Sequence, residues 1–177
     1  MTTMPMQTSL GIIDILSKFI VPLLVAALAA YFSTKFALNK FYKEKWWEKR
    51  LEAFTEIINI AYRIKMSNDY FLSCEYAQME PGDSKFKAHP KEIEEKLRAE
   101  YWLDLQELER IAQLADFTLT SKVKSILDVY VSDRRKIEND YYEDAIESLE
   151  VSEQDFKLSK KLLSDLVLEA KNELKIT

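Results

Sequence analysis

The chain has 177 residues, and its 25 basic and 30 acidic side chains give a formal net charge of -5. Two glycines and four prolines leave little turn material for strands, so the composition predicts an all-helical protein. A single cysteine excludes an intramolecular disulfide and a cysteine-based zinc site, as expected of a chain in the reducing cytoplasm.

One long uncharged run dominates the N-terminal part of the sequence. Residues 19–34 (FIVPLLVAALAAYFST) carry no charge and lie between Lys18 and Lys35. A helix of this length spans ~24 Å, and extending it to residue 38 brings it close to the ~30 Å hydrocarbon core of a bilayer. We therefore predict a transmembrane helix over residues 19–38, preceded by a short outside tail and interfacial lead-in over residues 1–18.

Two other interpretations of this run stay open at this point. A buried helix of a soluble core is the first, although the run is apolar on every face. A cleaved signal peptide is the second, because residues 27–29 (ALA) match the small-x-small cleavage pattern. However, a signal peptide would require a positively charged segment before the apolar run, and residues 1–17 contain no Lys or Arg. Both observations favour a retained membrane anchor.

The predicted span contains five residues with structural consequences: Phe19, Pro22, Ala26, Ala30 and Thr34. Phe19 opens the run, and Pro22 lacks the backbone donor that a continuous helix uses. The last three recur at every fourth position, so they form a small-residue stripe through which two spans could approach closely. A lipid-facing alanine surface is the alternative interpretation.

Positive charge is concentrated directly after the run. Lys18 is the one basic residue before it, whereas six follow within the ~15 to 20 positions that dominate membrane topology. We call these six the basic collar: Lys35, Lys40, Lys43, Lys45, Lys49 and Arg50. The asymmetry predicts an N-terminus outside the cell and residues 39–177 in the cytoplasm, with the basic collar against anionic lipid.

Nothing in the sequence stops the helix after residue 38, so we predict that the span continues into the cytoplasmic domain. Apolar residues then recur at spacings of four and three, at Trp47, Leu51, Phe54, Ile58 and Ala61. This pattern predicts a seam that faces a helical core. Trp47 lies too far along the helix from Lys35, at ~17 Å, to join an aromatic belt at the membrane, so we assign it to the core.

Three more amphipathic helices follow a break at residues 80–84 (EPGDS). The second helix is predicted to begin at Pro90 and to end near Phe117, which would plug the end of the bundle. Thr120 or Ser121 caps the third helix, and residues 152–155 (SEQD) form a capping box before the fourth. The core residues of the fourth helix include Leu163 and Leu166. Four helices with short links predict an antiparallel four-helix bundle over residues 39–177.

Residues 138–155 contain eight carboxylates and no Lys or Arg. Glu143, Glu147 and Glu150 are predicted to share one helical face, which could bind a divalent cation or a basic partner. An ordinary solvated face is the simpler interpretation. A di-metal bundle needs histidine pairs, and the sequence has only His89, in a predicted loop. We predict no metal, no cofactor and, because no basic stripe occurs outside the collar, no nucleic-acid partner.

The sequence does not predict catalysis. His89 precedes Pro90 in a turn pattern and is accompanied by no nucleophile motif. Cys74 lies beside Glu75, which would not lower a thiol pKa, so we assign Cys74 to the core. No glycine-rich phosphate loop is present. We therefore predict that the chain is not an enzyme.

Two stretches together resemble a group of known sequences. Residues 45–54 (KWWEKRLEAF) follow the span, and residues 115–121 (ADFTLTS) precede the third helix. They resemble uncharacterised small bacterial single-span membrane proteins that have a W-E-[KR]-[KR]-x-E-A-[YF] juxtamembrane helix and a later F-x-[IL]-[ST] turn. The resemblance covers residues 19 to about 130. It implies an inner-membrane location and an all-helical cytoplasmic domain, and it supplies no catalytic residues.

These observations predict a non-enzymatic, membrane-anchored helical module that binds a cytoplasmic protein partner or assembles with itself. The alternative is a membrane-perturbing effector of a phage-defence or toxin-type system, acting through oligomerisation of the span at Ala26 and Ala30. The sequence leaves open whether the bundle is closed within one chain or completed by a second copy.

Overall fold

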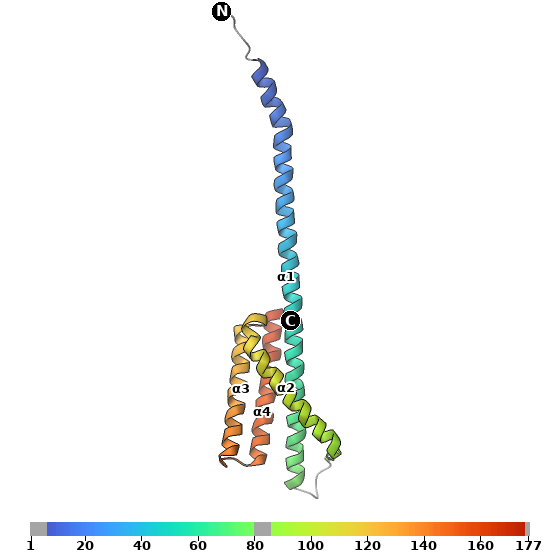
Figure 1. Cartoon of the computed structure of the whole chain (residues 1–177), viewed down its shortest axis with the longest axis vertical. Helices are drawn as coiled ribbons and strands as arrows, with labels where there is room; N and C mark the ends of the chain where they lie inside the picture. Colours follow the sequence, from blue (N-terminus) through green and yellow to red (C-terminus); the bar gives the residue numbers. More distant parts are fainter. Residues whose placement is uncertain (1–6, 80–85, 176–177) are drawn as a thin grey trace, which may run out of the picture. The chain divides into compact units, whose positions relative to one another are not determined.

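The computed structural model describes residues 7–79 and 86–175, with side chains from Lys18 onward apart from those of Phe117 and Thr118. It contains the helices α1 (Gln7–Met79), α2 (Lys91–Thr118), α3 (Ser121–Tyr142) and α4 (Ser148–Leu174) (Figure 1). No strand occurs among the described residues, so the predicted all-helical class is confirmed for this part of the chain.

The chain divides into two compact units inside α1, between Trp46 and Trp47. In the first unit, every described side chain, from residue 18 to residue 46, is exposed. Pro22 lies inside this part, and the helix is continuous through it. Because proline has no N–H, one backbone hydrogen bond is missing at that turn. The second unit, residues 47–177, has its own hydrophobic core, and we call it the helical domain.

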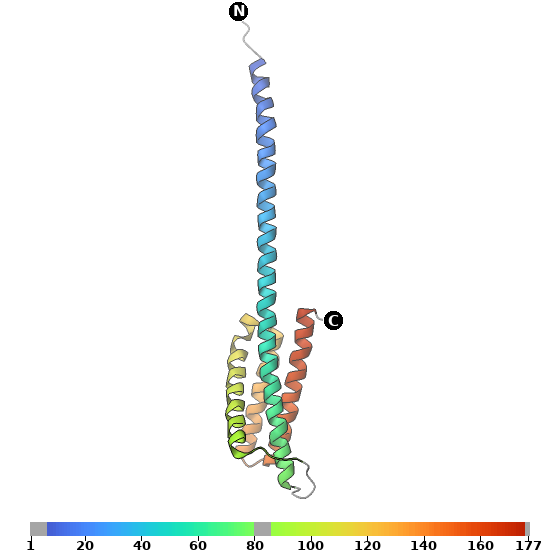
Figure 2. The same ribbon diagram turned by 90° about the vertical axis from the view of Figure 1, so that its right-hand side faces the viewer.

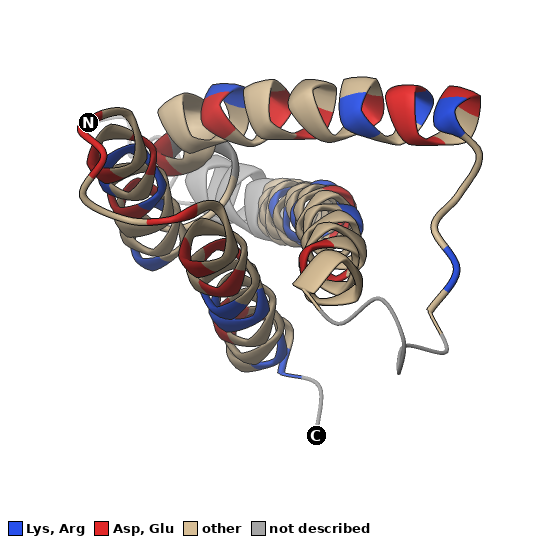
Figure 3. Ribbon diagram, turned by 90° about the horizontal axis from the view of Figure 1, so that it is seen from below, with Lys and Arg blue, Asp and Glu red and all other residues tan. Residues whose placement is uncertain are grey.

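Four helical segments build the helical domain. In Figure 1, α3 and α4 lie side by side, and α2 is inclined to both. The view turned by 90° separates α2 from α4, with residues 47–79 of α1 between them (Figure 2). Seen from below, α2 lies across the view while the other helices are seen nearly end-on (Figure 3). One core can therefore receive side chains from all four segments.

Each helix contributes one apolar stripe to that core. The α1 stripe consists of Phe54, Ile57, Ile60, Ala61 and Ile64, whose spacing of three, three, one and three places them on one face. The other helices contribute Tyr101, Leu105, Leu108, Ala112 and Ala115 from α2, Val123, Leu127 and Tyr130 from α3, and Leu162, Leu166, Ala170 and Leu174 from α4. This core positions the polar groups that are described below.

Most of the predicted core residues belong to the core or border it. Phe54 and Leu166 are buried, while Leu51, Ile58 and Leu163 are partly buried and pack against the core. The predicted seam follows a repeat of 3.5 residues, and this repeat places Ile58 toward the core. The structure instead buries position 57 fully, because α1 packs against neighbours on more than one side and its buried stripe is wider than a coiled-coil seam.

The prediction that Trp47 belongs to the core is wrong, because its side chain is 49% exposed. The fully buried part of α1 begins only at Phe54, ~10 Å further along the helix. A repeating apolar pattern gives the face of a helix but not the point at which neighbouring helices end. The side chain of Phe117, also predicted to be in the core, lies outside the described residues.

The caps of two helices were visible in the sequence. Pro90 precedes α2, and its carbonyl oxygen accepts from the N–H groups of Ile93 and Glu94 at 2.9 and 3.1 Å. The helix therefore begins one residue later than predicted. Thr120 caps α3, as predicted: its Oγ1 accepts from the Val123 N–H at 3.1 Å. This bond satisfies a donor that the first turn would otherwise leave unpaired.

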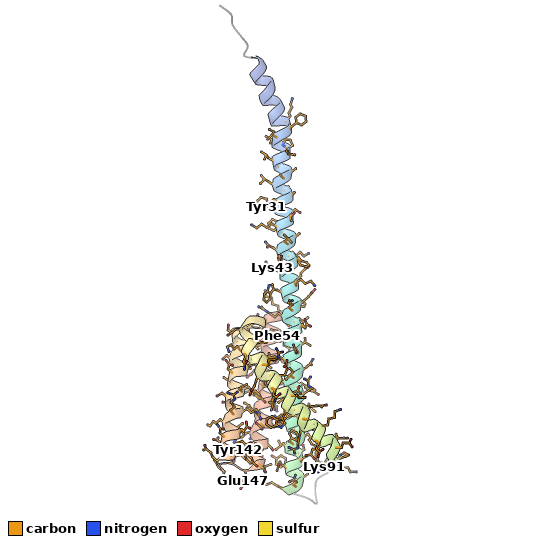
Figure 4. All side chains as sticks on the ribbon, viewed as in Figure 1. Tyr31, Lys43, Phe54, Lys91, Tyr142 and Glu147 are labelled. Carbon is orange, nitrogen blue, oxygen red and sulfur yellow. The ribbon has the colours of Figure 1, made fainter. Side chains whose placement is uncertain are left out.

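The predicted start of the fourth helix is wrong. α4 begins at Ser148, so the predicted capping box at Ser152 lies inside the helix. The chain reverses direction over residues 143–147, where Asp144 adopts a left-handed conformation with φ of 54°. Aspartate tolerates this region better than most residues, so the turn needs no glycine and leaves a weak signal. Figure 4 shows Tyr142 and Glu147 at this end of the domain.

Candidate functional site

One helix of the described chain is long and apolar enough to cross a membrane. The candidate segment lies in α1 from Lys18 onward, and none of its apolar window is buried. Its exposed side chains include Phe19, Leu23, Leu24, Val25 and Leu28. An apolar surface of this kind is unfavourable in water. Residues 19–38 are therefore the candidate for a lipid-facing segment.

The small-residue stripe lies on this segment. Ala26, Ala30 and Thr34 are all exposed. The Thr34 hydroxyl donates to the Ala30 carbonyl oxygen at 2.8 Å, so the hydroxyl is satisfied within its own helix. The stripe therefore needs no partner to satisfy its polar group, and self-association through it stays a prediction.

The two units divide the basic collar between them. The first unit contains Lys35, Lys40, Lys43 and Lys45, and the helical domain contains Lys49 and Arg50. Lys40 lies 3.8 Å from Glu44 in the next turn. Arg50 is paired within the helical domain, because its Nη1 donates to Glu173 Oε2 of α4 at 3.1 Å. Arg50 therefore joins α1 to α4 within the helical domain.

A polar cluster lies in the helical domain, with three buried members and two partly buried ones, Arg134 and Asp155, and it draws on all four helices. It consists of Asn68 on α1, Tyr101 on α2, Tyr130 and Arg134 on α3, and Asp155 on α4. The Asn68 amide donates to the backbone oxygen of Asp155 at 3.1 Å, and the Tyr101 hydroxyl interacts with Asn68 and Arg134. Burial raises the pKa of Tyr101 to about 12 and also raises that of Tyr130, so both remain neutral phenols at physiological pH.

Asp155 is the acid of the polar cluster. Burial raises the pKa of its carboxyl group to about 6; Arg134 lowers the pKa and Glu138 raises it. Burial acts in this direction because it disfavours the charged form. At neutral pH the ionised Asp155 therefore lowers the free energy of unfolding of the domain. A destabilising, partly buried acid beside the core is a candidate for function.

Arg134 brings a buried positive charge to the same cluster. Burial lowers its pKa, but Tyr101 and Asp155 raise it by more, so the guanidinium stays charged. The guanidinium carbon lies 5.1 Å from the ring centroid of Trp102, and Nη1 lies 3.7 Å from Glu138 Oε2. Its buried Nε has no hydrogen-bond partner among the described residues. The cluster is thus only partly satisfied, unlike the apolar core around it.

A cavity of about 410 Å³ lies beside the polar cluster, with walls from α1, α2, α4 and the segment before α2. Three carboxylates line it, those of Glu75, Glu94 and Asp155. Arg98 is the one basic residue that lines it among the described residues, and its Nη2 donates to Glu94 Oε1 at 2.8 Å. Its volume falls within the roughly 300–1,000 Å³ of small-molecule sites.

Cys74 and His89 lie close to these elements. Cys74 is only partly buried and lines the cavity, so its assignment to the core is wrong. His89 lies in the segment before α2, where its ring stacks on that of Tyr70 with the centroids 4.7 Å apart. The His89 backbone N–H also donates to the Tyr70 hydroxyl oxygen at 3.0 Å. These contacts are consistent with the predicted role of His89 as a turn residue.

The predicted acidic face does not exist as a single helical face. Glu143 follows the end of α3 as its C-cap residue, Glu147 precedes α4, and Glu150 lies in the first turn of α4. Glu150 accepts a hydrogen bond from the side chain of Gln154 at 3.1 Å. Figure 3 shows acidic residues at this turn and charges of both signs along the helices. No group of three or more His, Cys, Asp or Glu residues could hold a metal ion in the described part of the chain.

The polar cluster was missed by the sequence analysis. Ser67 and Asn68 continue the apolar stripe of α1 with polar side chains, and both are buried. A polar residue at a stripe position is the signal that could have found them. Asp155 was hidden because the misplaced start of α4 assigned it to a helix cap.

The chain matches no family model, no curated protein and no solved structure. The resemblance of residues 45–54 to small bacterial single-span proteins therefore stays a prediction.

Proposed function

We propose that the chain is a non-enzymatic, membrane-anchored helical module. Residues 19–38 would span the membrane, and the helical domain would bind a protein partner or a second copy at the cytoplasmic face. The observation that carries the proposal is the complete exposure of the described side chains in residues 18–46, of which residues 19–34 are uncharged. Lipid is the solvent that such a helical segment requires.

The distribution of charge supports the proposed orientation. Lys18 precedes the uncharged run, and the six residues of the basic collar follow it. An inner-membrane protein retains such positive segments in the cytoplasm, where they also meet anionic lipid. The N-terminus would therefore be outside the cell and the helical domain inside it.

The architecture of the domain supports a role in binding. We propose that the four segments form a closed antiparallel bundle in the membrane-bound protein, since successive helices run in opposite directions in Figures 1 and 2. Its surface carries exposed large apolar side chains, including Tyr62 and Met66 one turn apart on α1, and Leu103 and Leu168. Of these, aromatic and methionine side chains such as Tyr62 and Met66 are enriched in the cores of protein interfaces.

Fractionation of cells that express the full-length chain tests the anchor. The protein should sediment with membranes and resist extraction with alkaline carbonate, whereas recovery in the soluble fraction without detergent would contradict the proposal. Orientation is tested in a Cys74→Ser background with a single cysteine at Ser9 or Ser121. A membrane-impermeant maleimide should label the Ser9→Cys variant in spheroplasts and reach the Ser121→Cys variant only after lysis.

In-cell crosslinking distinguishes the two modes of binding. Single cysteines replace Ala26, Ala30 or Leu51 in the Cys74→Ser background. Efficient dimers at Ala26 or Ala30 would favour self-assembly, on which the membrane-perturbing alternative also depends. If no position yields dimers, a different protein is the partner. Growth and membrane potential during overexpression then test the membrane-perturbing alternative directly.

A further inference from the structure

We propose that the cavity beside the polar cluster is a binding site for a small organic cation, namely an ammonium compound with an apolar or aromatic body. The inference concerns the helical domain alone. It stands or fails independently of the membrane anchor and of any protein partner.

The charge of the walls selects a cation. Three carboxylates and one guanidinium line the cavity, which gives a formal net charge of -2. The guanidinium of Arg98 is committed to Glu94 at 2.8 Å. Glu75 accepts a hydrogen bond from the Ser148 hydroxyl at 3.2 Å and makes no ion pair among the described residues. A positive ligand would therefore find at least one carboxylate without a cationic partner.

The apolar walls of the cavity are aromatic. Phe71, Phe86, Tyr101 and Trp102 all line it. Two of these rings already attract cations of the chain itself: Arg98 lies 4.8 Å from the centroid of Phe71, and Arg134 lies 5.1 Å from that of Trp102. Aromatic rings attract cations through their negative faces and also cover the apolar body of a ligand. These walls consequently fit an ammonium group attached to an apolar body better than a hydrated metal ion.

The carboxylate of Asp155 favours the binding of a cation in the cavity. Its ionised carboxylate lines the cavity and is destabilised by burial. A cation within ~4–6 Å favours the charged form of a carboxylate. Binding would thus relieve an unfavourable interaction that the empty domain carries, and this relief would add to the affinity.

Calorimetry on the full-length chain in non-ionic detergent micelles tests the inference, with phenethylamine as the probe and 2-phenylethanol as its neutral counterpart. We expect saturable binding of the amine at roughly millimolar concentration or below, and at least about tenfold weaker binding of the alcohol. Asp155→Asn and Glu75→Gln should each weaken binding of the amine about tenfold or more. The matched control Asp133→Asn removes an exposed carboxylate from α3 and should leave binding unchanged.

Differences between variants report on binding, because micelle partitioning and folding are controlled for. Partitioning is the same for every variant, and circular dichroism verifies that each is helical. Equal binding of amine and alcohol, amine binding that survives both Asp155→Asn and Glu75→Gln, or no saturable binding of the amine would each overturn the inference.

Discussion

The two parts of α1 share one backbone conformation and differ in what surrounds it. In residues 18–46, every described side chain is exposed, although residues 19–34 are uncharged. In residues 47–79, the same helix alternates between buried side chains, such as Phe54 and Ile64, and exposed ones, such as Tyr62. The uncharged run of the first part is apolar on all sides, while the second part is apolar on one stripe.

This difference shows that helical structure alone does not reveal what stabilises a helix. A stripe can be buried by neighbouring helices within the chain, whereas an apolar surface on every side needs a solvent that is itself apolar. The arrangement of apolar residues around the axis therefore separates the candidate membrane segment from the helical domain, even though the backbone does not change.

The largest effect is expected when charges are introduced into the uncharged run of α1, residues 19–34. Leu24→Lys with Leu28→Lys should abolish carbonate-resistant membrane association, because each lysine near the bilayer centre costs about 2.5–3.5 kcal/mol, or about 5–7 kcal/mol together. Cell fractionation and carbonate extraction measure the loss. The matched control carries Val129→Lys with Leu168→Lys on exposed apolar positions of the helical domain, and it should remain in the membrane. Unchanged extraction of the first variant would rule out the span.

The core of the second part is tested next. Phe54→Ala should lower the free energy of unfolding of the helical domain by about 3–5 kcal/mol, because it leaves a cavity in a core where Phe54 is 1% exposed. Trp47→Ala should change it by less than about 0.5 kcal/mol, because Trp47 lies outside the core. Urea unfolding of the full-length chain in micelles, followed by circular dichroism, measures both. A loss at Trp47 as large as that at Phe54 would mean that the core extends toward the first part.

The polar cluster predicts a stability gain with a defined pH dependence. Burial raises the pKa of Asp155 from 3.8 to about 6, so the folded state binds the proton more tightly than the unfolded state. The parent protein should therefore lose up to about 3 kcal/mol of unfolding free energy from this group as pH rises from about 4 to about 7. Asp155→Asn does not titrate, so it should be more stable than the parent by up to that amount near pH 7 and about equal to it below pH 4.

Urea unfolding curves at several pH values measure the effect of Asp155→Asn. Asp133→Asn, which removes an exposed carboxylate, serves as the control and should follow the parent at every pH. An Asp155→Asn variant that is less stable than the parent near pH 7 would show that the electrostatic attraction of Arg134 outweighs the burial of the carboxylate.

Much of the fold could be predicted from the sequence because local signals specify it. The scarcity of glycine is visible in the composition, while the apolar spacing around Phe54 and the cap at Thr120 each depend on residues that are close together in the chain. The helix ends that lacked such signals were placed wrongly. Asp144 adopts a left-handed conformation, which aspartate tolerates better than most residues. The turn therefore contains no glycine or proline that would have predicted it from the sequence.

The candidate site depends on contacts between distant residues, and this is why the sequence did not reveal it. Asn68 and Asp155 are joined by a hydrogen bond across 87 positions. Whether Asp155 is solvated or buried depends on where α4 begins, and Trp47 is exposed because neighbouring helices end before they reach it. Patterns in the sequence predict the face of a helix, whereas burial at its ends depends on the lengths of its neighbours.

The smallest effect is expected at Arg50, which lies where the two parts of α1 meet. The pair with Glu173 is at the surface, with about a third of each side chain exposed, so Arg50→Gln should lower the free energy of unfolding by less than about 1 kcal/mol. A double-mutant cycle with Glu173→Gln isolates the pair, and its coupling should shrink as salt is added. The matched variant Lys43→Gln should leave domain stability unchanged and weaken binding to anionic vesicles by about 1 kcal/mol. The opposite result would be that Arg50→Gln shows no coupling with Glu173 and weakens lipid binding as Lys43→Gln does. Arg50 would then act with the lysines of the basic collar at the lipid surface, and the boundary between the two parts would lie further along α1.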